Sequence, residues 1–266
     1  MRNGLIVEFR WLYVVNLLIA VTFGVLLFVL PGAVDIYGPW VIPNAHSAYL
    51  VGAAYVGAPI YYAAALRRNS WPIARNGVGG LIFFSLALLV ATMFHWDRFR
   101  PYVPTTLLWL VLYYLPPVGY PILSRVQMAR NGNDRAPGVD ISTPWRYWLI
   151  ARGGLYAALA VLGLLFAPSI VPDWPWPITP LEVRVFMGQL AINAWGGAIV
   201  LLGDLRWQHN RLGLALTGTV GAAQLLGLLL GGGPYNWSSP LGILLPLMFL
   251  EWVATTVLMF SVYRNR

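Results

Sequence analysis

The side chains best placed to do chemistry are four polar residues within apolar stretches of the second half of the chain. They are Arg152, Gln189, Asn193 and Glu251. Polar groups are costly to leave in hydrocarbon, so each one within a membrane segment marks a candidate site. Glu251 lies about eleven residues into the last apolar run, which at about 1.5 Å per residue places it near the bilayer midplane. Gln189 and Asn193 are four positions apart and share one helix face, so we expect Asn193 to meet Glu251 at one depth.

These four residues allow two interpretations. Polar side chains between membrane helices often act only as hydrogen-bonding glue that fixes the packing. Alternatively, they form a pocket in the second bundle that holds a proton, a polar headgroup or a small ligand. Arg152 is expected nearer the inner side, where its long side chain either extends to the inner interface or forms a structural ion pair. The carboxyl group of Glu251 is expected to take up a proton unless a cation faces it.

The outer edge of the membrane carries the remaining candidates. Glu182 and Arg184 flank the start of the sixth apolar run, where a carboxylate stabilises a helix N-terminus. His46 and His95 also fall at this edge, and two imidazoles on neighbouring helices can ligate one iron. Haem or chlorophyll at His46 and His95 is therefore a minor alternative. We expect no other cofactor and no metal site, and His209 is expected to be solvated in an inner connector.

Composition narrows the chemistry further. The chain has 266 residues, of which 59% are hydrophobic and 10% charged, and its mean hydropathy of +0.67 lies outside the range of soluble domains. There is no Lys to form a Schiff base and no Cys to act as a thiolate nucleophile or iron–sulfur ligand. Signatures of P-loops, zinc proteases and serine hydrolases are also lacking. A membrane enzyme is therefore the least expected class, and no catalytic residue is assigned.

Eight apolar runs are long enough to span a bilayer, for which about 20 residues are needed. The sequence therefore predicts an all-α integral membrane protein with eight transmembrane helices. We place these helices at about 11–33, 47–66, 77–94, 105–123, 147–168, 183–203, 212–230 and 240–263.

Arginine predicts the orientation. With both termini cytoplasmic, thirteen of the 17 Arg residues fall on the inner side, and only Arg98, Arg100 and Arg184 fall outside. Basic residues concentrate in cytoplasmic loops, so we predict a multi-pass protein of the bacterial cytoplasmic (inner) membrane. The net charge of +8 comes from short Arg clusters between apolar runs. This pattern indicates the lipid bilayer and other membrane subunits as partners and argues against nucleic acid.

A duplicated segment organises the chain. Trp71 and Arg75 are matched by Trp207 and Arg211, 136 positions later, within the related sequences LRRNSWPIARNGVGG and LGDLRWQHNRLGLAL. We interpret both segments as inner connectors in which Trp lies at the interface and a glycine opens the next helix. Four spans separate the copies, so the two repeats are expected to be parallel, related by an axis along the membrane normal.

The duplication divides the chain into three parts. The first four-helix repeat is expected at 1–124 and the second at 147–266, joined by a cytoplasmic linker at 125–146. The linker contains the sequence Asn-Gly-Asn-Asp-Arg-Ala-Pro-Gly, which is typical of a flexible surface loop.

The second repeat also carries a recognisable set of outer motifs. They are Leu-Leu-Phe-Ala-Pro168, then Trp174-Pro-Trp-Pro-Ile-Thr-Pro-Leu-Glu-Val-Arg184, Gly188, and Tyr235-Asn-Trp237. In these motifs the chain resembles bacterial polytopic membrane proteins built of DoxX-like four-helix units. The first half matches only as a diverged copy. The resemblance implies a bundle of four-helix units and transfers no function.

Two functions remain in view. The favoured one is a non-enzymatic scaffold or accessory subunit of a membrane assembly, with a lipid or a quinone-like molecule as its ligand. The alternative is a transporter or channel for a small hydrophobic solute or a proton, with its polar site around Glu251. Because the first half supplies few polar groups at membrane depth, a path for charged solutes is not expected.

Overall fold

The computed structural model describes residues 4–131 and 138–264, and in this part of the chain the fold is entirely helical. Eight of its helices are long and apolar enough to cross a membrane, which confirms the predicted fold class. They are α1 (Val7–Gly24, continued by a π-helical turn at Val25–Val29), α3 (Ala45–Arg68), α4 (Trp71–Phe94), α5 (Pro104–Asn131), α6 (Thr143–Ile170), α7 (Pro180–Leu201), α8 (Trp207–Leu230) and α9 (Pro240–Tyr263). A short helix, α2 (Val34–Tyr37), follows α1.

The third and seventh spans begin earlier than the sequence suggested. α4 starts at Trp71 and α8 at Trp207, so the predicted role of Gly77 and Gly213 in opening these helices is wrong. In α4, Pro72 occupies the first turn, where its missing N–H is not needed and its fixed φ suits a helix. As a result, most of the duplicated segment is helical and lies within the bundle.

Helices extend into both ends of the segment predicted as a linker, 125–146. α5 continues to Asn131, and the chain from Val139 to Ile141 pairs with the loop before α8. The Ile141 N–H donates to the Leu205 carbonyl at 2.7 Å, and Ile141 is fully buried. Most of the predicted flexible loop, at 132–137, lies outside the described residues, as do Arg2, Arg135 and Arg266 of the predicted inner side.

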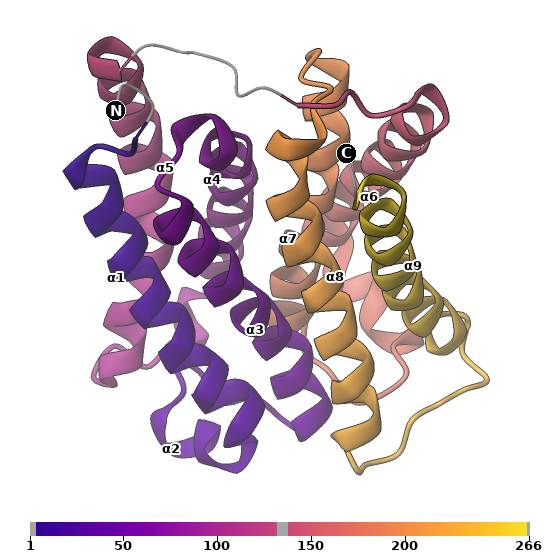
Figure 1. The fold of residues 1–266 in the computed structure, drawn as a ribbon. Coiled ribbons are helices and arrows are strands. Elements are labelled where there is room, and N and C mark those ends of the chain that lie inside the picture. The colour runs from indigo at the N-terminus through magenta and orange to yellow at the C-terminus, as the bar shows by residue number, and fades with distance from the viewer. Residues whose placement is uncertain (1–3, 132–137, 265–266) are drawn as a thin grey trace.

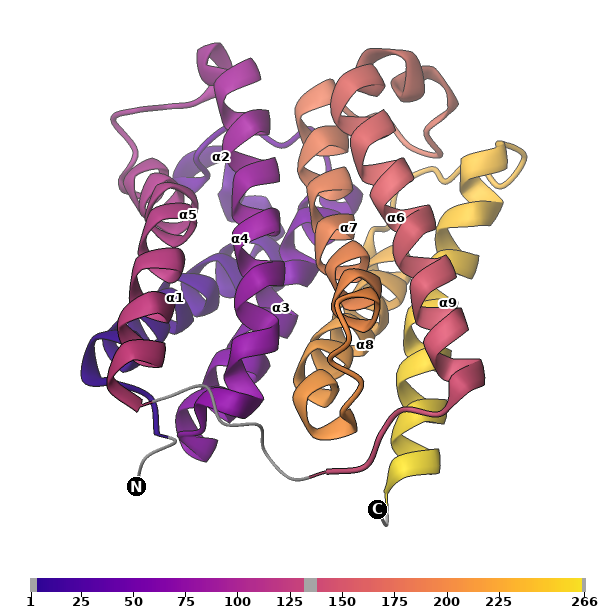
Figure 2. The ribbon, with the colours of Figure 1, turned by 90° about the horizontal axis from the view of Figure 1, so that it is seen from above.

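The eight spans form two groups that pack side by side (Figures 1 and 2). α1, α3, α4 and α5 form one group, and α6 to α9 form the other. The groups meet where α3 packs on α8 and α4 packs on α7. In both views α1 begins at the same end of the bundle at which α9 ends, as an even number of spans requires.

The helix boundaries follow the spacing of the sequence repeat. α6, α8 and α9 begin 136 positions after α1, α4 and α5 respectively. The second helix of each half packs on the third helix of the other, which is the reciprocity expected of a twofold-related pair. These correspondences are those a duplication predicts. The parallel repeat arrangement and the proposed boundaries remain predictions.

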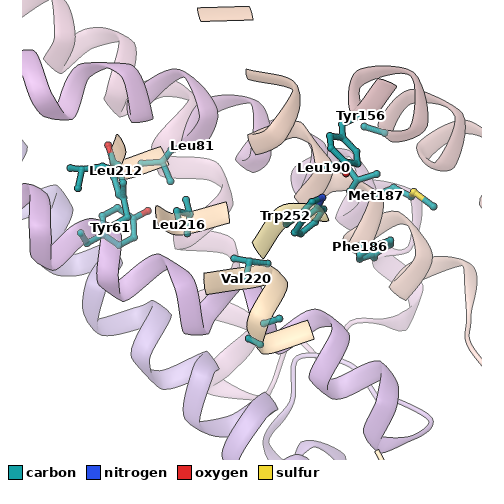
Figure 3. Close-up of a cluster of buried hydrophobic side chains, with 14 of the residues drawn as sticks. Tyr61, Leu81, Tyr156, Phe186, Met187, Leu190, Leu212, Leu216, Val220 and Trp252 are labelled. Atoms are coloured by element: carbon teal, nitrogen blue, oxygen red, sulfur yellow. The ribbon is translucent and has the colours of Figure 1, made fainter. Parts of the chain in front are cut away.

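The apolar core is continuous across the two groups (Figure 3). Tyr61 of α3 and Leu81 of α4 belong to the same buried cluster as Leu212 and Leu216 of α8. Trp252 of α9 extends this cluster into the second group. Apolar packing therefore joins the halves, and any polar group in their interface must find its partner within the protein or in something that the protein binds.

Glycine allows the closest helix contact in the second group. A methyl group added at Gly153 of α6 would lie 2.6 Å from the Cα of Gly197 in α7. One added at Gly197 would lie 2.6 Å from the carbonyl oxygen of Leu149. The α6 and α7 backbones are thus in direct contact, as in other membrane helix pairs with small residues at the interface.

Substitution at this contact tests the packing. Gly153→Ala should lower the stability by about 1–3 kcal/mol, because the added methyl group forces the two backbones apart. Gly154→Ala is the matched control, since a methyl group there meets no atom within 4 Å. Thermal unfolding in detergent should separate the two variants. Equal melting temperatures would contradict the α6–α7 contact.

Candidate functional site

A cavity lies in the interface between the two groups of helices. Its wall is formed by residues of α3, α4, α6, α7 and α8. The centre of a water molecule can occupy about 40 Å³ within the cavity. On this measure, roughly 10–15 Å³ is enough to hold one water. The polar lining residues are Tyr61, Asn76, Arg152, Asn193, His209, Asn210 and Thr217.

Four of these residues leave a buried polar atom without a hydrogen-bond partner. The atoms are Asn76 Nδ2, Arg152 Nη2, Asn193 Oδ1 and His209 Nε2. The four residues are buried, with exposed fractions between 1% and 9%. They come from four different helices, α4, α6, α7 and α8. Because buried polar groups almost always have a partner, this convergence marks the cavity as the place for a polar occupant.

Asp204, in the loop between α7 and α8, lies beside His209, one of the residues that line the cavity. Its carboxylate accepts a hydrogen bond from Arg75 Nη2 of α4 at 2.7 Å and lies 2.9 Å from His209 Nδ1. Burial raises the pKa of the Asp204 carboxyl, but the hydrogen bonds from Arg75 and His209 outweigh it and hold the pKa below its ordinary value. Asp204 is therefore a carboxylate that binds one residue from each half.

The prediction that His209 is solvated is wrong. Its side chain is fully buried, because α8 begins two residues before it and turns the ring into the interface. Nδ1 faces Asp204, so in the neutral ring the proton on Nδ1 is donated to the carboxylate. Nε2, at the edge of the cavity, then carries a free lone pair.

A second ion pair involves Arg152 of α6, which lines the cavity. Arg152 Nε donates to both oxygens of Glu251, at 2.8 and 3.0 Å. Tyr156 and Thr255 donate to the same carboxylate at 2.6 and 2.7 Å. Of the two expectations for Arg152, the structure shows the ion pair, and Arg152 is the cation that faces Glu251. Glu251 itself is not among the residues that line the cavity.

Gln189 lies apart from this cluster. Together with Gln224 of α8 it joins α7 and α8 to the backbone of α3: Gln189 Nε2 donates to the Leu50 carbonyl at 3.1 Å and Gln224 Nε2 donates to it at 2.9 Å. Gln224 Nε2 also donates to Gln189 Oε1. The predicted group therefore separates into three places: Gln189 ties helices together, Asn193 faces the cavity, and Glu251 holds Arg152.

The outer candidates are buried and serve the fold. Glu182 forms a capping box with Thr179 and accepts a hydrogen bond from Trp40 Nε1 of the first half at 2.9 Å. Arg184 Nε donates to the Leu164 carbonyl at 2.8 Å. That carbonyl lacks its usual helical partner because Pro168, four residues later, has no N–H. Arg184 therefore stabilises a break in α6.

The two outer histidines have different neighbours. His46 stacks on Trp176, with ring centroids 5.2 Å apart, whereas the ring of His95 contacts the guanidinium group of Arg184. The described residues contain no group of three or more His, Cys, Asp or Glu that could hold a metal ion. The two imidazoles thus contact different residues. Haem or chlorophyll ligation at His46 and His95 remains an untested prediction.

Sequence reasoning missed three residues of the site: Asn76, Asp204 and His209. All three fall in the duplicated segments, which were assigned to connectors. One signal could have found them. Asp204 is the only acidic residue in either copy, and it lies among arginines five positions before a histidine. A single carboxylate among arginines and a histidine indicates that it pairs with one of these basic side chains.

No protein-family model, curated protein or solved structure matches this chain. The assignment of a function therefore depends on the geometry of the site. The resemblance to DoxX-like units remains a prediction.

The Arg152–Glu251 pair makes a first prediction for the site. Glu251→Gln leaves the Arg152 charge without its carboxylate and should lower the stability by about 3 kcal/mol, the low end for breaking a buried pair, because Glu251 is 24% exposed. The double variant Arg152→Met/Glu251→Leu should lose much less. The exposed Glu8–Arg130 pair is the control, where Glu8→Gln should leave the stability nearly unchanged because solvent screens the pair. A double variant less stable than Glu251→Gln would contradict the pairing.

His95 makes a prediction about pH. Burial lowers the pKa of its imidazole, and the charge of Arg184 lowers it further. The folded state therefore favours neutral His95, and this contribution to stability is present above about pH 6.5 and lost as the pH falls. The melting temperature should fall less between pH 7 and pH 5 in His95→Gln than in the wild type. An equally steep fall in both would show that His95 has an ordinary pKa.

Proposed function

We propose that this chain is a multi-pass membrane protein that binds a small polar solute in the cavity between its two halves, as a carrier or channel does. One observation carries the proposal. Four polar atoms from four helices, on Asn76, Arg152, Asn193 and His209, converge on one cavity without protein partners. In hydrocarbon such groups are costly unless a ligand or water satisfies them.

The size of the cavity limits the solute. It has room for only a few water-sized groups. A solute of a few non-hydrogen atoms fits, whereas a lipid chain or a quinone ring requires the helices to part. Asn76 and Asn193 can each turn an amide oxygen or an amide nitrogen toward the solute. The site therefore suits a molecule with both hydrogen-bond acceptors and donors.

The proposed function is the transport alternative, with its polar site in the cavity between the halves instead of around Glu251. The sequence placed the polar site around Glu251 in the second half, and the first half appeared to supply too few polar groups. Asn76 and Tyr61 of the first half line the cavity, and Arg75 of the first half binds Asp204, which in turn contacts His209 of the cavity wall. A site shared by both halves is open to change when the halves move relative to one another, as alternating access requires.

The proposed setting is a bacterial cytoplasmic membrane with both termini inside. The distribution of Arg supports this orientation, since basic loops stay cytoplasmic. Under this topology Asp204 and the first turn of α8 lie on the cytoplasmic side. The cavity is then nearer to the cytoplasm than to the outside, and the Arg75–Asp204 pair lies on its cytoplasmic side.

A scaffold or accessory subunit is the competing proposal. Glycine-mediated contacts such as Gly153 with Gly197 support a rigid packing unit. Purification from the native membrane followed by mass spectrometry separates the two functions. Stoichiometric protein partners, or a bound lipid or quinone-like molecule, would favour the accessory role.

Blocking the cavity tests solute binding. Gly213 lines the cavity, and a side chain there meets no atom within 4 Å at its first carbon, so Gly213→Leu should fill the space. Gly154→Leu is the matched control outside the cavity. The panel of probes is formamide, urea, formate, acetate and nitrate, and the readout is the melting temperature in detergent.

At least one probe should stabilise the wild type and Gly154→Leu but not Gly213→Leu. At about 100 times Kd, binding contributes about 2.7 kcal/mol to stability, enough to move the melting temperature measurably. If every probe acts equally on all three proteins, or on none, solute binding in the cavity is excluded for this class of molecule.

A further inference from the structure

Four of the fixed charges near the cavity cancel one another in pairs. Arg152 is paired with Glu251, and Arg75 is paired with Asp204. An ion that enters the cavity therefore meets no uncompensated fixed charge from these four groups. Because a buried ion is costly without a countercharge, either the ligand is neutral or a second charge enters with it.

His209 is the group that can supply that second charge. It is the one imidazole on the cavity wall, and its Nε2 is buried without a partner. Its Nδ1 lies 2.9 and 3.0 Å from the two oxygens of Asp204. A proton added to Nε2 makes an imidazolium that is stabilised by Asp204 on one side and faces the cavity on the other.

The unpaired polar atoms on the cavity wall favour an anion as the ligand that binds together with this proton. Arg152 Nη2 and Asn76 Nδ2 are donors, and protonated His209 Nε2 becomes a third. Asn193 adds a fourth when its amide nitrogen faces inward. A small carboxylate or similar oxyanion has enough acceptor lone pairs to take all of these hydrogen bonds.

The charged and titratable groups facing His209 come from each neighbouring element. Asp204 and Arg206 face it from the loop before α8, and Arg75 from α4. Tyr61 of α3 and Arg152 of α6 share the cavity wall with it. Glu251 of α9 is engaged by Arg152. In this set Asp204 favours the imidazolium, and the charges of Arg75 and Arg206 oppose it, so a bound anion is needed to stabilise the added proton.

We propose that the cavity binds a small monoanion together with one proton, which His209 accepts on Nε2. This inference rests on the proposed solute-binding function and names its substrate class. The proton comes from solvent and forms the Nε2–H bond. The bound anion accepts a hydrogen bond from that N–H, and the loaded cavity has no net charge beyond that of the empty one. Release of the anion returns the proton.

Formate and formamide test the proposal as an anion and a neutral molecule of similar size. Their binding to the purified full-length protein is measured by equilibrium dialysis of labelled probe between pH 5 and pH 8. If anion and proton bind together, the apparent Kd for formate should rise about tenfold per pH unit once free His209 is deprotonated. Formamide binding should not change with pH.

Two variants identify the proton acceptor. His209→Gln keeps a hydrogen-bonding side chain but no titrating ring, so its formate binding should be weaker at pH 5 and independent of pH. His46→Gln replaces a buried histidine away from the cavity and should retain the wild-type pH dependence. As a measurement that needs no active variant, the 13C NMR signal of His209 in the wild type should titrate at higher pH when formate saturates the protein.

Each other outcome overturns a defined part of the proposal. Formate binding that is independent of pH in the wild type, or an NMR titration that formate leaves unmoved, excludes a coupled proton. A pH dependence that persists in His209→Gln means that formic acid binds as a neutral molecule and that His209 is not the acceptor. Binding of formamide alone excludes the anion but retains the solute site. If neither probe binds the wild type, the proposed function itself fails for solutes of this size.

Discussion

Hydrocarbon offers no partner to a polar group, so every polar side chain in the interior of this bundle must be satisfied by the protein or by something it binds. In this structure much of that pairing crosses the interface between the two halves. Arg75 binds Asp204 near the starts of α4 and α8, Gln189 and Gln224 bind the Leu50 carbonyl within the bundle, and Trp40 binds Glu182 near the starts of α3 and α7. At the cavity this pairing is incomplete on four helices at once.

The same interface explains how a cavity persists in a tightly packed fold. Gly79 and Gly80 of α4 leave space for the large ring of Trp195, whose Nε1 donates to the Asn76 carbonyl at 2.6 Å. Gly196 and Gly213, on the cavity wall, have no atom within 4 Å of where a side chain would begin. Ring packing holds the helices apart on one side, and the two glycines leave the space beside it open. Because the residues around the cavity are small or ion-paired, the cavity removes few apolar contacts from the rest of the bundle.

The sequence predicted the scaffold better than the site. Long apolar runs identify membrane helices because the bilayer fixes their length, but the ends of helices depend on capping residues and Pro positions that hydropathy does not register. Because hydropathy alone begins α8 at about residue 212, it places His209 in a solvated connector and not in this helix. An assumed start near residue 147 also put Arg152 too close to the inner surface. Because α6 begins at Thr143, Arg152 lies about 14 Å along it and reaches the level of Glu251. This shift of a few ångströms along α6 decides whether Arg152 can reach Glu251.

The central claim is that the cavity between the halves holds a polar occupant that bonds to residues of both halves. An experimental structure at a resolution that shows ordered water tests it most directly. The account predicts density within hydrogen-bonding distance of His209 Nε2, Arg152 Nη2 and the side-chain amides of Asn76 and Asn193. A collapsed interface, in which these four groups bond to one another and leave no density between them, would contradict it.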